Sequence, residues 1–272
     1  MDIIQALTDE LQVQRWQVEA AVKLIDEGNT IPFISRYRKE ATGSLNDEVL
    51  RNLHERLLYL RNLEDKKAQV LSSIEEQGKL TEELKNAILA AQTLVVVEDL
   101  YRPYRPKRRT RATVAKEKGL EPLANIILLQ MTEQPLEIEA EPFVSEEKGV
   151  ADVKEALAGA QDILAEAISD GADYRIYIRK MTVKSGTLAS SAKKEGEESV
   201  YEMYYDFEEP VSKIAGHRVL ALNRGEKEKI LTVKINAPEE EILKWLKRQV
   251  IKKENPNTSP ILEAAVEDSY KR

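Results

Sequence analysis

Apolar residues recur every three or four positions over most of this chain, which is the spacing of one face of an α-helix. The longest such stripe runs through residues 47–77 and contains Leu50, Leu53, Leu57 and Leu60. Gly78 ends the stripe, and the pattern predicts a helix of more than about seven turns. Thr81 can cap a second helix over residues 81–92. We expect these two helices to form an antiparallel hairpin.

Shorter periodic segments flank this hairpin. Residues 2–40 predict three short helices that are compatible with a helix-turn-helix-like unit, although a plain three-helix packing unit is the commoner arrangement. The second of these helices would carry Trp16 on its apolar face. Residues 151–169 predict another amphipathic helix. The only strong strand signal is the alternating segment ILTVKINAP, which predicts a small β element near 230–236, whereas the alternation over residues 174–179 is ambiguous between helix and strand.

These patterns predict a mainly α fold, a multi-helical elongated scaffold with one small β element. Eleven glycines in 272 residues agree with a helical composition. Residues 132–148 hold six glutamates, two prolines and no cation before Lys148, which indicates an acidic linker. We therefore expect four parts: a helix-turn-helix-like unit at 1–45, the long hairpin with a basic loop at 46–131, the linker at 132–148, and a second helical subdomain with the short strand at 149–272.

Several functional classes find no support in the composition. The chain has no cysteine and only two histidines, His54 and His217, so neither a thiolate nor a histidine metal site is expected. Phosphate-binding glycine loops, nucleophile motifs and clustered carboxylates for catalytic metals do not occur. We expect no enzyme activity and no cofactor. No apolar run approaches the roughly 20 residues of a membrane helix, so a cytoplasmic protein without a membrane partner is expected.

Charge is distributed unevenly. The whole chain carries a net charge of −7, yet residues 100–118, the basic segment, hold eight cations against the single anion Glu117. Pro103 and Pro106 forbid a regular helix, so we predict a stiff exposed loop. Guanidinium groups fit phosphate, and tyrosine rings can stack on bases. The candidate nucleic-acid-binding residues of this segment are Tyr101, Arg102, Tyr104, Arg105, Lys107, Arg108, Arg109 and Arg111.

A second group of cations, Arg36, Arg38 and Lys39, occurs in the predicted third helix. Both groups could neutralise phosphates with little readout of bases, which leaves RNA and DNA open as partners. The alternative is that the basic segment grips acidic side chains, either in its own fold or on a protein partner. An exposed, unpaired segment would favour nucleic acid. A segment held by salt bridges would favour the alternative.

Five segments carry, in order, a resemblance to a known family. They are SRYRKEATGSLND (35–47), YLRNLEDKKAQVLSSIEEQGKLTEEL (59–84), EDLYRPYRPKRRTRATVAKEKGLEPLA (98–124), ALAGAQDILAEAISDGADYR (156–175) and HRVLALNRGEKE (217–228). This series resembles the N-terminal region of the bacterial Tex family of transcription accessory proteins. The resemblance implies a multi-domain cytoplasmic protein in which a helical N-terminal region precedes an RNase H-like domain, helix-hairpin-helix motifs and a C-terminal OB-fold RNA-binding module.

The chain ends before any sequence that the resemblance would assign to the RNase H-like domain, so we expect it to be the N-terminal region alone. The function implied is a contribution to non-sequence-specific binding of RNA or DNA in transcription. The alternative is a protein-interaction scaffold whose basic segment docks on RNA polymerase, on other transcription machinery, or on other domains of the full-length chain. The resemblance implies no enzyme activity.

Overall fold

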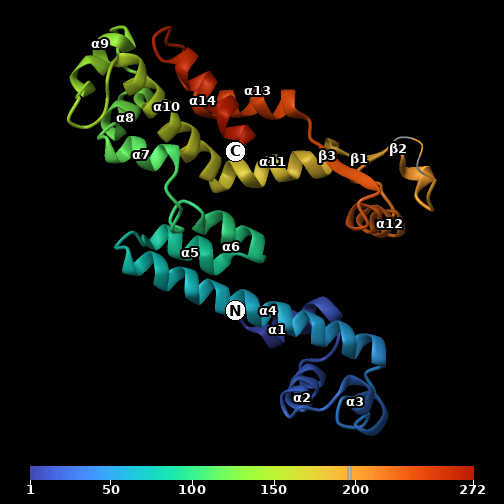
Figure 1. Cartoon of the computed structure of the whole chain (residues 1–272). Helices are drawn as coiled ribbons and strands as arrows, with labels where there is room; N and C mark the ends of the chain where they lie inside the picture. Colours follow the sequence, from blue (N-terminus) through green and yellow to red (C-terminus); the bar gives the residue numbers. More distant parts are fainter. Residues whose placement is uncertain (195, 197) are drawn as a thin grey trace. The chain divides into compact units, whose positions relative to one another are not determined.

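A computed structural model describes residues 1–194, 196 and 198–272. The chain folds into two compact units, Met1–Tyr104 and Arg105–Arg272 (Figure 1). The structure is mainly helical with a small three-stranded antiparallel sheet, which confirms the predicted fold class. The boundary between the units falls inside the basic segment. Within the described residues, no helix combines the length and the apolar character that crossing a membrane requires.

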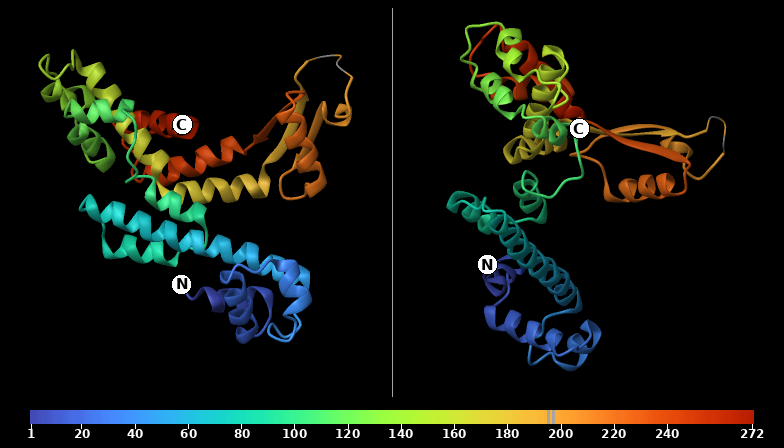
Figure 2. Two further views of the ribbon diagram at one scale, coloured as in Figure 1. Left: turned by 60° about the horizontal axis from the view of Figure 1, so that its bottom comes forward. Right: turned by 60° about the vertical axis from the view of Figure 1, so that its left-hand side comes forward.

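The first unit is built on one long helix. Both views of Figure 2 show this helix extending along the unit. This helix, α4 (Asp47–Glu76), has 30 residues, and its first turn is capped by the Asn46 side chain, which accepts a hydrogen bond from the Val49 amide. The predicted leucine stripe is buried along it. The helices that pack on α4 are α1 (Ile3–Leu11), α2 (Arg15–Asp26), α3 (Ile31–Tyr37), α5 (Glu82–Ala90) and α6 (Leu94–Tyr101).

The second unit is organised around α10 (Val153–Asp170), a helix that Asp152 caps by accepting a hydrogen bond from the Glu155 amide. Apolar side chains on several sides of α10 join one large core, because other helices pack against it on those sides. The helices with the most extensive contacts are α7 (Arg111–Glu117), α8 (Glu121–Leu129), α9 (Leu136–Ala140) and α14 (Ser259–Lys271). Two further helices, α11 (Ala172–Ser185) and α13 (Glu239–Val250), contact each other and stack Tyr177 on Trp245.

A small sheet and α12 (Gly216–Lys227) extend from α11 (Figure 1). The strand order is β2-β1-β3, and the central strand β1 (Thr187–Ala192) pairs antiparallel with both β2 (Asp206–Pro210) and β3 (Leu231–Asn236). A separate small core joins the sheet to α12 and to the 3-10 helix η2 (Glu202–Tyr204), with Tyr201, Tyr204, Leu222 and Leu231 buried. Strand β3 lies where the sequence predicted a β element.

Two segments differ from their sequence-based description. Residues 132–148, expected to be a linker, contain α9 and the 3-10 helix η1 (Glu141–Phe143), and they bury Leu136 and Ala140 in the core around α10. The basic segment is a loop only from 102 to 110. Beyond Pro106 the sequence regains helix formers, and the Thr110 side chain caps α7 by accepting a hydrogen bond from the Thr113 amide. The prediction of a loop throughout residues 100–118 was therefore wrong for Leu100 and Tyr101, which end α6, and for Arg111–Glu117, which form α7.

Candidate nucleic-acid interface

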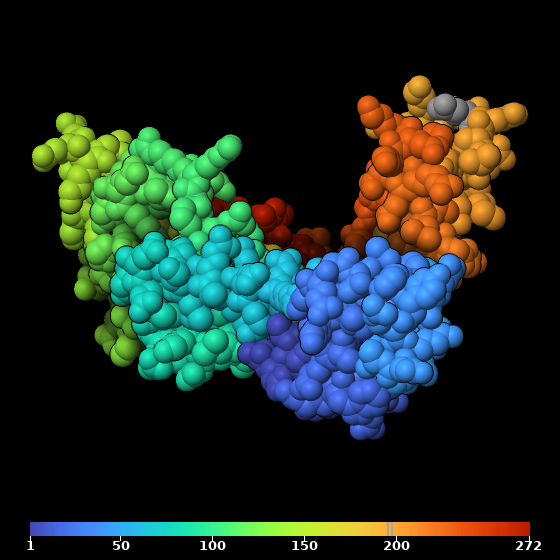
Figure 3. All heavy atoms as spheres, turned by 90° about the horizontal axis from the view of Figure 1, so that it is seen from below, coloured from blue at the N-terminus to red at the C-terminus, as the bar shows by residue number. Residues whose placement is uncertain are grey.

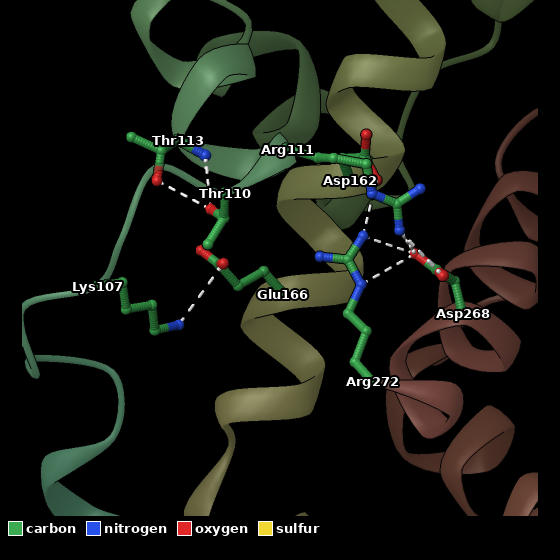
Figure 4. A network of polar contacts seen from close by, with 8 residues as sticks. All are labelled: Lys107, Thr110, Arg111, Thr113, Asp162, Glu166, Asp268 and Arg272. Carbon is green, nitrogen blue, oxygen red and sulfur yellow. Dashed lines mark hydrogen bonds and ion pairs between the residues drawn. The ribbon is translucent and has the colours of Figure 1, made fainter.

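Most cations of the basic segment in the second unit pair with carboxylates of that same unit. Lys107 forms an ion pair with Glu166 on α10 at 3.6 Å (Figure 4), and it forms a second one with Asp170 on the same helix. The Asp170 side chain is only 9% exposed, so the lysine compensates a largely buried carboxylate. Three other cations of the segment also pair nearby: Arg109 with Glu117 at 2.8 Å, Lys116 with Glu121 at 3.8 Å and Lys118 with Glu155 at 2.6 Å.

Arg111 belongs to a four-residue network that ties three helices together (Figure 4). From the start of α7 it reaches Asp162 on α10 at 3.3 Å and Asp268 on α14 at 3.2 Å. Arg272 reaches the same two carboxylates, at 2.7 and 2.6 Å. Burial alone would raise the pKa of Asp268, but the hydrogen bonds and charges of Arg272 and Arg111 outweigh it and hold that pKa below its ordinary value. The network therefore fastens α7 to α10 and α14.

Lys118, like Arg111, pairs with a carboxylate of α10. It donates to Glu155 in the first turn of α10, and the same carboxylate accepts a hydrogen bond from the Ala151 amide. The Lys118 hydrogen bond, followed by that amide, lowers the pKa of Glu155. Arg108, in contrast, is exposed and has no ion-pair partner among the residues that the structure describes.

The two tyrosines of the basic segment pack in the first unit. The Tyr101 hydroxyl lies 2.9 Å from the Ser73 hydroxyl, and the ammonium group of Lys66 is 6.0 Å from its ring centre. The Tyr104 carbonyl accepts a hydrogen bond from the Gln77 side chain at 3.0 Å. Both rings are half-buried against the core of that unit. Stacking of nucleic-acid bases on them stays a prediction.

The cations at the end of α3 are in a different environment. Arg36, Arg38 and Lys39 are exposed, and in the described part of the chain none of them pairs with a carboxylate. The guanidinium of Arg38 lies 5.2 Å from the Phe33 ring centre and donates to the Tyr37 carbonyl at 3.2 Å. Tyr37 is 66% exposed and its ring centre is 5.3 Å from that of Phe33. This group is available to an external anion without first breaking an ion pair.

Sequence reasoning missed the aromatic residues around these cations. It placed Trp16 on an apolar helix face, but Trp16 is 52% exposed at the start of α2. Tyr37 was not among the predicted site residues, although it lies between cations in SRYRKE. That alternation of an aromatic ring with cations is the signal that could have identified it. For metal chemistry, the described residues contain no group of three or more potential ligands.

Comparison with known proteins identifies the chain's relatives. Residues 1–75 match the Tex-like protein N-terminal domain, and residues 131–263 match the Tex central region-like domain. An uncharacterized protein of Bacillus subtilis, YdcI, is 47% identical over 271 residues, which is 98% of this chain and 38% of that protein. Transcriptional accessory protein Tex of Neisseria gonorrhoeae is 44% identical over 235 residues, 86% of this chain and 31% of the relative.

A more distant relative is human S1 RNA-binding domain-containing protein 1, which is 30% identical over 287 aligned positions that cover all of this chain and 28% of that protein. The chain thus spans about a third of the length of the curated relatives it matches. Two domain models match successive parts of the chain, and relatives from several bacteria match most of its length at about 45% identity. The chain therefore belongs to the Tex family and carries its N-terminal and central regions.

Proposed function

We propose that this chain contributes non-sequence-specific nucleic-acid binding, and that Arg36, Arg38 and Lys39 at the end of α3 are its principal phosphate contacts. One observation carries this: the three cations are adjacent and exposed, and no carboxylate in the described part of the chain neutralises them. Neutralising backbone phosphates releases counterions and supplies affinity without reading sequence. Arg108, and the exposed guanidinium of Arg109, would add weaker contacts from the second unit.

The names of two relatives support a role of this binding in transcription. The Neisseria gonorrhoeae relative is a transcriptional accessory protein, and the human relative contains an S1 RNA-binding domain. We infer that this chain acts in transcription as part of a longer, cytoplasmic RNA-binding protein. Its N-terminal and central regions would hold the backbone of the nucleic acid while another part of the protein supplies further contacts.

A second candidate function, a protein-interaction scaffold, is favoured by two observations. The basic segment is fastened by salt bridges to its own unit, which is the arrangement expected of a structural connection. Near the small sheet, Leu220 on α12 is 71% exposed and Ile235 on β3 is 58% exposed. A contact with another domain or with RNA polymerase would remove these two apolar side chains from water.

We further propose that this region has no catalytic activity of its own. A metal-dependent nuclease would need clustered carboxylates to hold its ions. The check is incubation of the purified chain with labelled RNA and DNA in the presence of Mg²⁺ or Mn²⁺. Turnover that is lost on substitution of one carboxylate would refute the proposal.

The binding proposal is tested by fluorescence anisotropy of the chain with single-stranded RNA and with duplex DNA at two salt concentrations. Three phosphate contacts predict a loss of affinity of roughly 20-fold for the single strand, and of roughly 40-fold for the duplex, between about 50 and 200 mM salt. Oligonucleotides of scrambled sequence should bind equally well. Absence of binding to either nucleic acid at the lower salt would leave the scaffold function in its place.

A further inference from the structure

The corner formed by α2, α3 and the turn after α3 carries exposed aromatic rings beside unpaired cations. We propose that this corner is a base-stacking site for single-stranded nucleic acid, with Trp16 and Tyr37 as the stacking rings and the Arg36–Lys39 cations as the phosphate contacts. The inference rests on the proposed nucleic-acid binding and specifies its substrate: single strands rather than duplex. The α2–α3 region, drawn in blue, forms an open part of the first unit's surface (Figure 3).

Trp16 is held by one edge. A Cβ atom added to Gly43 would lie 2.4 Å from Cη2 and 3.0 Å from Cζ2 of the indole, so this edge rests directly on the glycine backbone. Gly43 also has a φ of +60°, a conformation that glycine adopts without strain. The indole is thereby fixed in position while about half of the residue stays open to solvent. A ring that is already immobilised loses little conformational freedom when a base stacks on it.

The turn that supports Trp16 is the same turn that begins with the cations. The Gln17 side chain donates to the carbonyls of Thr42 and Gly43, at 3.3 and 3.1 Å. The buried Thr42 hydroxyl in turn lies 3.2 Å from the Arg38 carbonyl and 3.4 Å from that of Lys39. The Ser44 amide closes the turn on the Lys39 carbonyl at 2.7 Å. A continuous set of contacts therefore connects the ring of Trp16 to the backbone that carries Arg38 and Lys39.

Tyr37 supplies the second ring. It lies against Phe33 with an angle of 45° between the ring planes, and Phe33 is contacted by the Arg38 guanidinium as well. This contact holds Tyr37 from one side and leaves it 66% exposed. No hydrogen bond engages the Tyr37 hydroxyl within the described residues. The tyrosines of the basic segment differ, because Tyr101 and Tyr104 pack against the core of their own unit.

The combination of groups favours a single strand over the other polyanions. Duplex DNA presents phosphates, but its bases already stack on one another. An acidic protein surface presents carboxylates and has no flat aromatic face for each ring to cover. A single strand presents both phosphates and free base faces, and each stacked base contributes to affinity without regard to its sequence. Exposed Trp and Tyr beside Arg and Lys match those two features together.

The test compares two single-stranded probes of equal charge: an oligothymidine of about 12 nucleotides, and an abasic strand of the same length that keeps its phosphates. The parent chain should bind oligothymidine roughly 5- to 150-fold more tightly for each base that stacks. Trp16→Ala should remove most of this preference while leaving affinity for the abasic strand unchanged. Tyr37→Ala should reduce the preference, and Tyr37→Phe, which keeps the ring, should retain it.

A spectroscopic measurement covers the case in which Trp16→Ala perturbs folding. The chain has two tryptophans, and Trp245 stacks on Tyr177 in the second unit. In Trp245→Phe the emission comes from Trp16 alone, so oligothymidine should quench it at the concentrations at which it binds. The abasic strand should bind with little quenching.

The outcomes separate this inference from the proposed function. Equal affinity for the two probes, or a preference that survives Trp16→Ala, refutes the stacking site while leaving phosphate binding intact. Failure of the parent to bind either probe or duplex DNA refutes both, and assigns the exposed rings to a protein contact. Quenching of Trp16 that is equal for both probes would likewise contradict stacking.

Discussion

Two cationic groups of the chain differ in what surrounds them. In the second unit, Lys107, Arg111 and Lys118 pair with carboxylates of α10 and α14. At the end of α3, Arg36, Arg38 and Lys39 have no carboxylate partner in the described part of the chain and stand beside exposed rings. The basic segment, to which the first group belongs, holds more cations, eight against three. The second has more charge that an external anion can reach.

The number of cations in a segment therefore does not tell how many of them an external anion can reach. A cation that already pairs with a carboxylate must exchange one anion for another on binding, so its net gain is small. A cation that faces only water gains the full effect of counterion release. The cations of the basic segment mainly hold the helices of the second unit together, whereas the cations at the end of α3 are accessible to an external anion. The following changes test that difference, from the largest expected effect to the smallest.

Charge reversal should separate the two groups most clearly. Lys107→Glu would place a third carboxylate beside those of Asp170 and Glu166. We expect the free energy of unfolding to fall by about 2–4 kcal/mol. Arg38→Glu, the matched change at α3, should cost less than about 1 kcal/mol, since it removes one cation–π contact and no ion pair. Urea denaturation measures both. Equal losses of stability in the two variants would contradict the distinction between structural cations in the second unit and accessible cations at the end of α3.

The glycine turn beside the α3 cations offers a second comparison. Gly43→Ala should destabilise the chain by about 1–2 kcal/mol through its left-handed backbone, and more where the new methyl meets Trp16. Gly28→Ala is the control, because Gly28 has a φ of +84° with open space around its Cβ position. Only Gly43→Ala should change the tryptophan emission. An unchanged spectrum would mean that Gly43 does not position Trp16.

Removing charge from the basic segment should have a modest effect on binding. In one variant, Arg105, Lys107, Arg108 and Arg109 are all changed to alanine. The salt slope, which is the slope of log affinity against log salt concentration, should then fall by about 0.7 for a single strand, which corresponds to the loss of one phosphate contact. Lys107 and Arg109 already pair with carboxylates and Arg105 has a partner of its own within the fold, so only the contact made by Arg108 is expected to be lost. A thermal melt should show reduced stability. A fall in slope of about 2.8 would restore the segment as the main interface.

The smallest effect concerns pH. The lowered pKa of Glu155 means that its pairing with Lys118 stabilises the fold above the ordinary glutamate value of 4.5, and that this contribution is lost as pH falls through the lowered pKa. The difference in stability between the parent and Lys118→Ala should therefore be present at pH 7 and disappear in acid. Denaturation curves at pH 7 and below pH 4 would reveal it. A difference that persists in acid would show that Lys118 acts through packing.

Local features of the sequence were sufficient to predict the helical framework. Helix α4 follows from its leucine spacing and from Gly78 just beyond its end, both of which lie within one segment. Strands β1 and β2 were not predicted, because TLASSA has small side chains and DFEEP holds three acids and a proline, so neither alternates clearly. Their pairing depends on partners distant in the chain, which local periodicity cannot identify.

The candidate site illustrates the same limit. The sequence identifies Arg111 as a cation, but its partner Asp268 is 157 positions away. Lys107 and Asp170 are likewise 63 positions apart. Trp16 has the spacing of a core residue, yet its contact with Gly43 places it at the surface. Residue types that could bind nucleic acid are therefore readable from sequence, whereas the neutralisation of some of them and the exposure of others depend on tertiary contacts.

The most direct test is one binding measurement on two variants that lose the same charge. One carries Arg36→Ala, Arg38→Ala and Lys39→Ala, and the other carries Lys107→Ala, Arg111→Ala and Lys118→Ala. We expect the first to lose most of its affinity for single-stranded RNA at low salt, with a salt slope smaller by about 2 and an unchanged melting temperature. The second should melt earlier but, below its transition, bind nearly as well as the parent. The reverse result, with binding lost only in the second variant, would contradict the account.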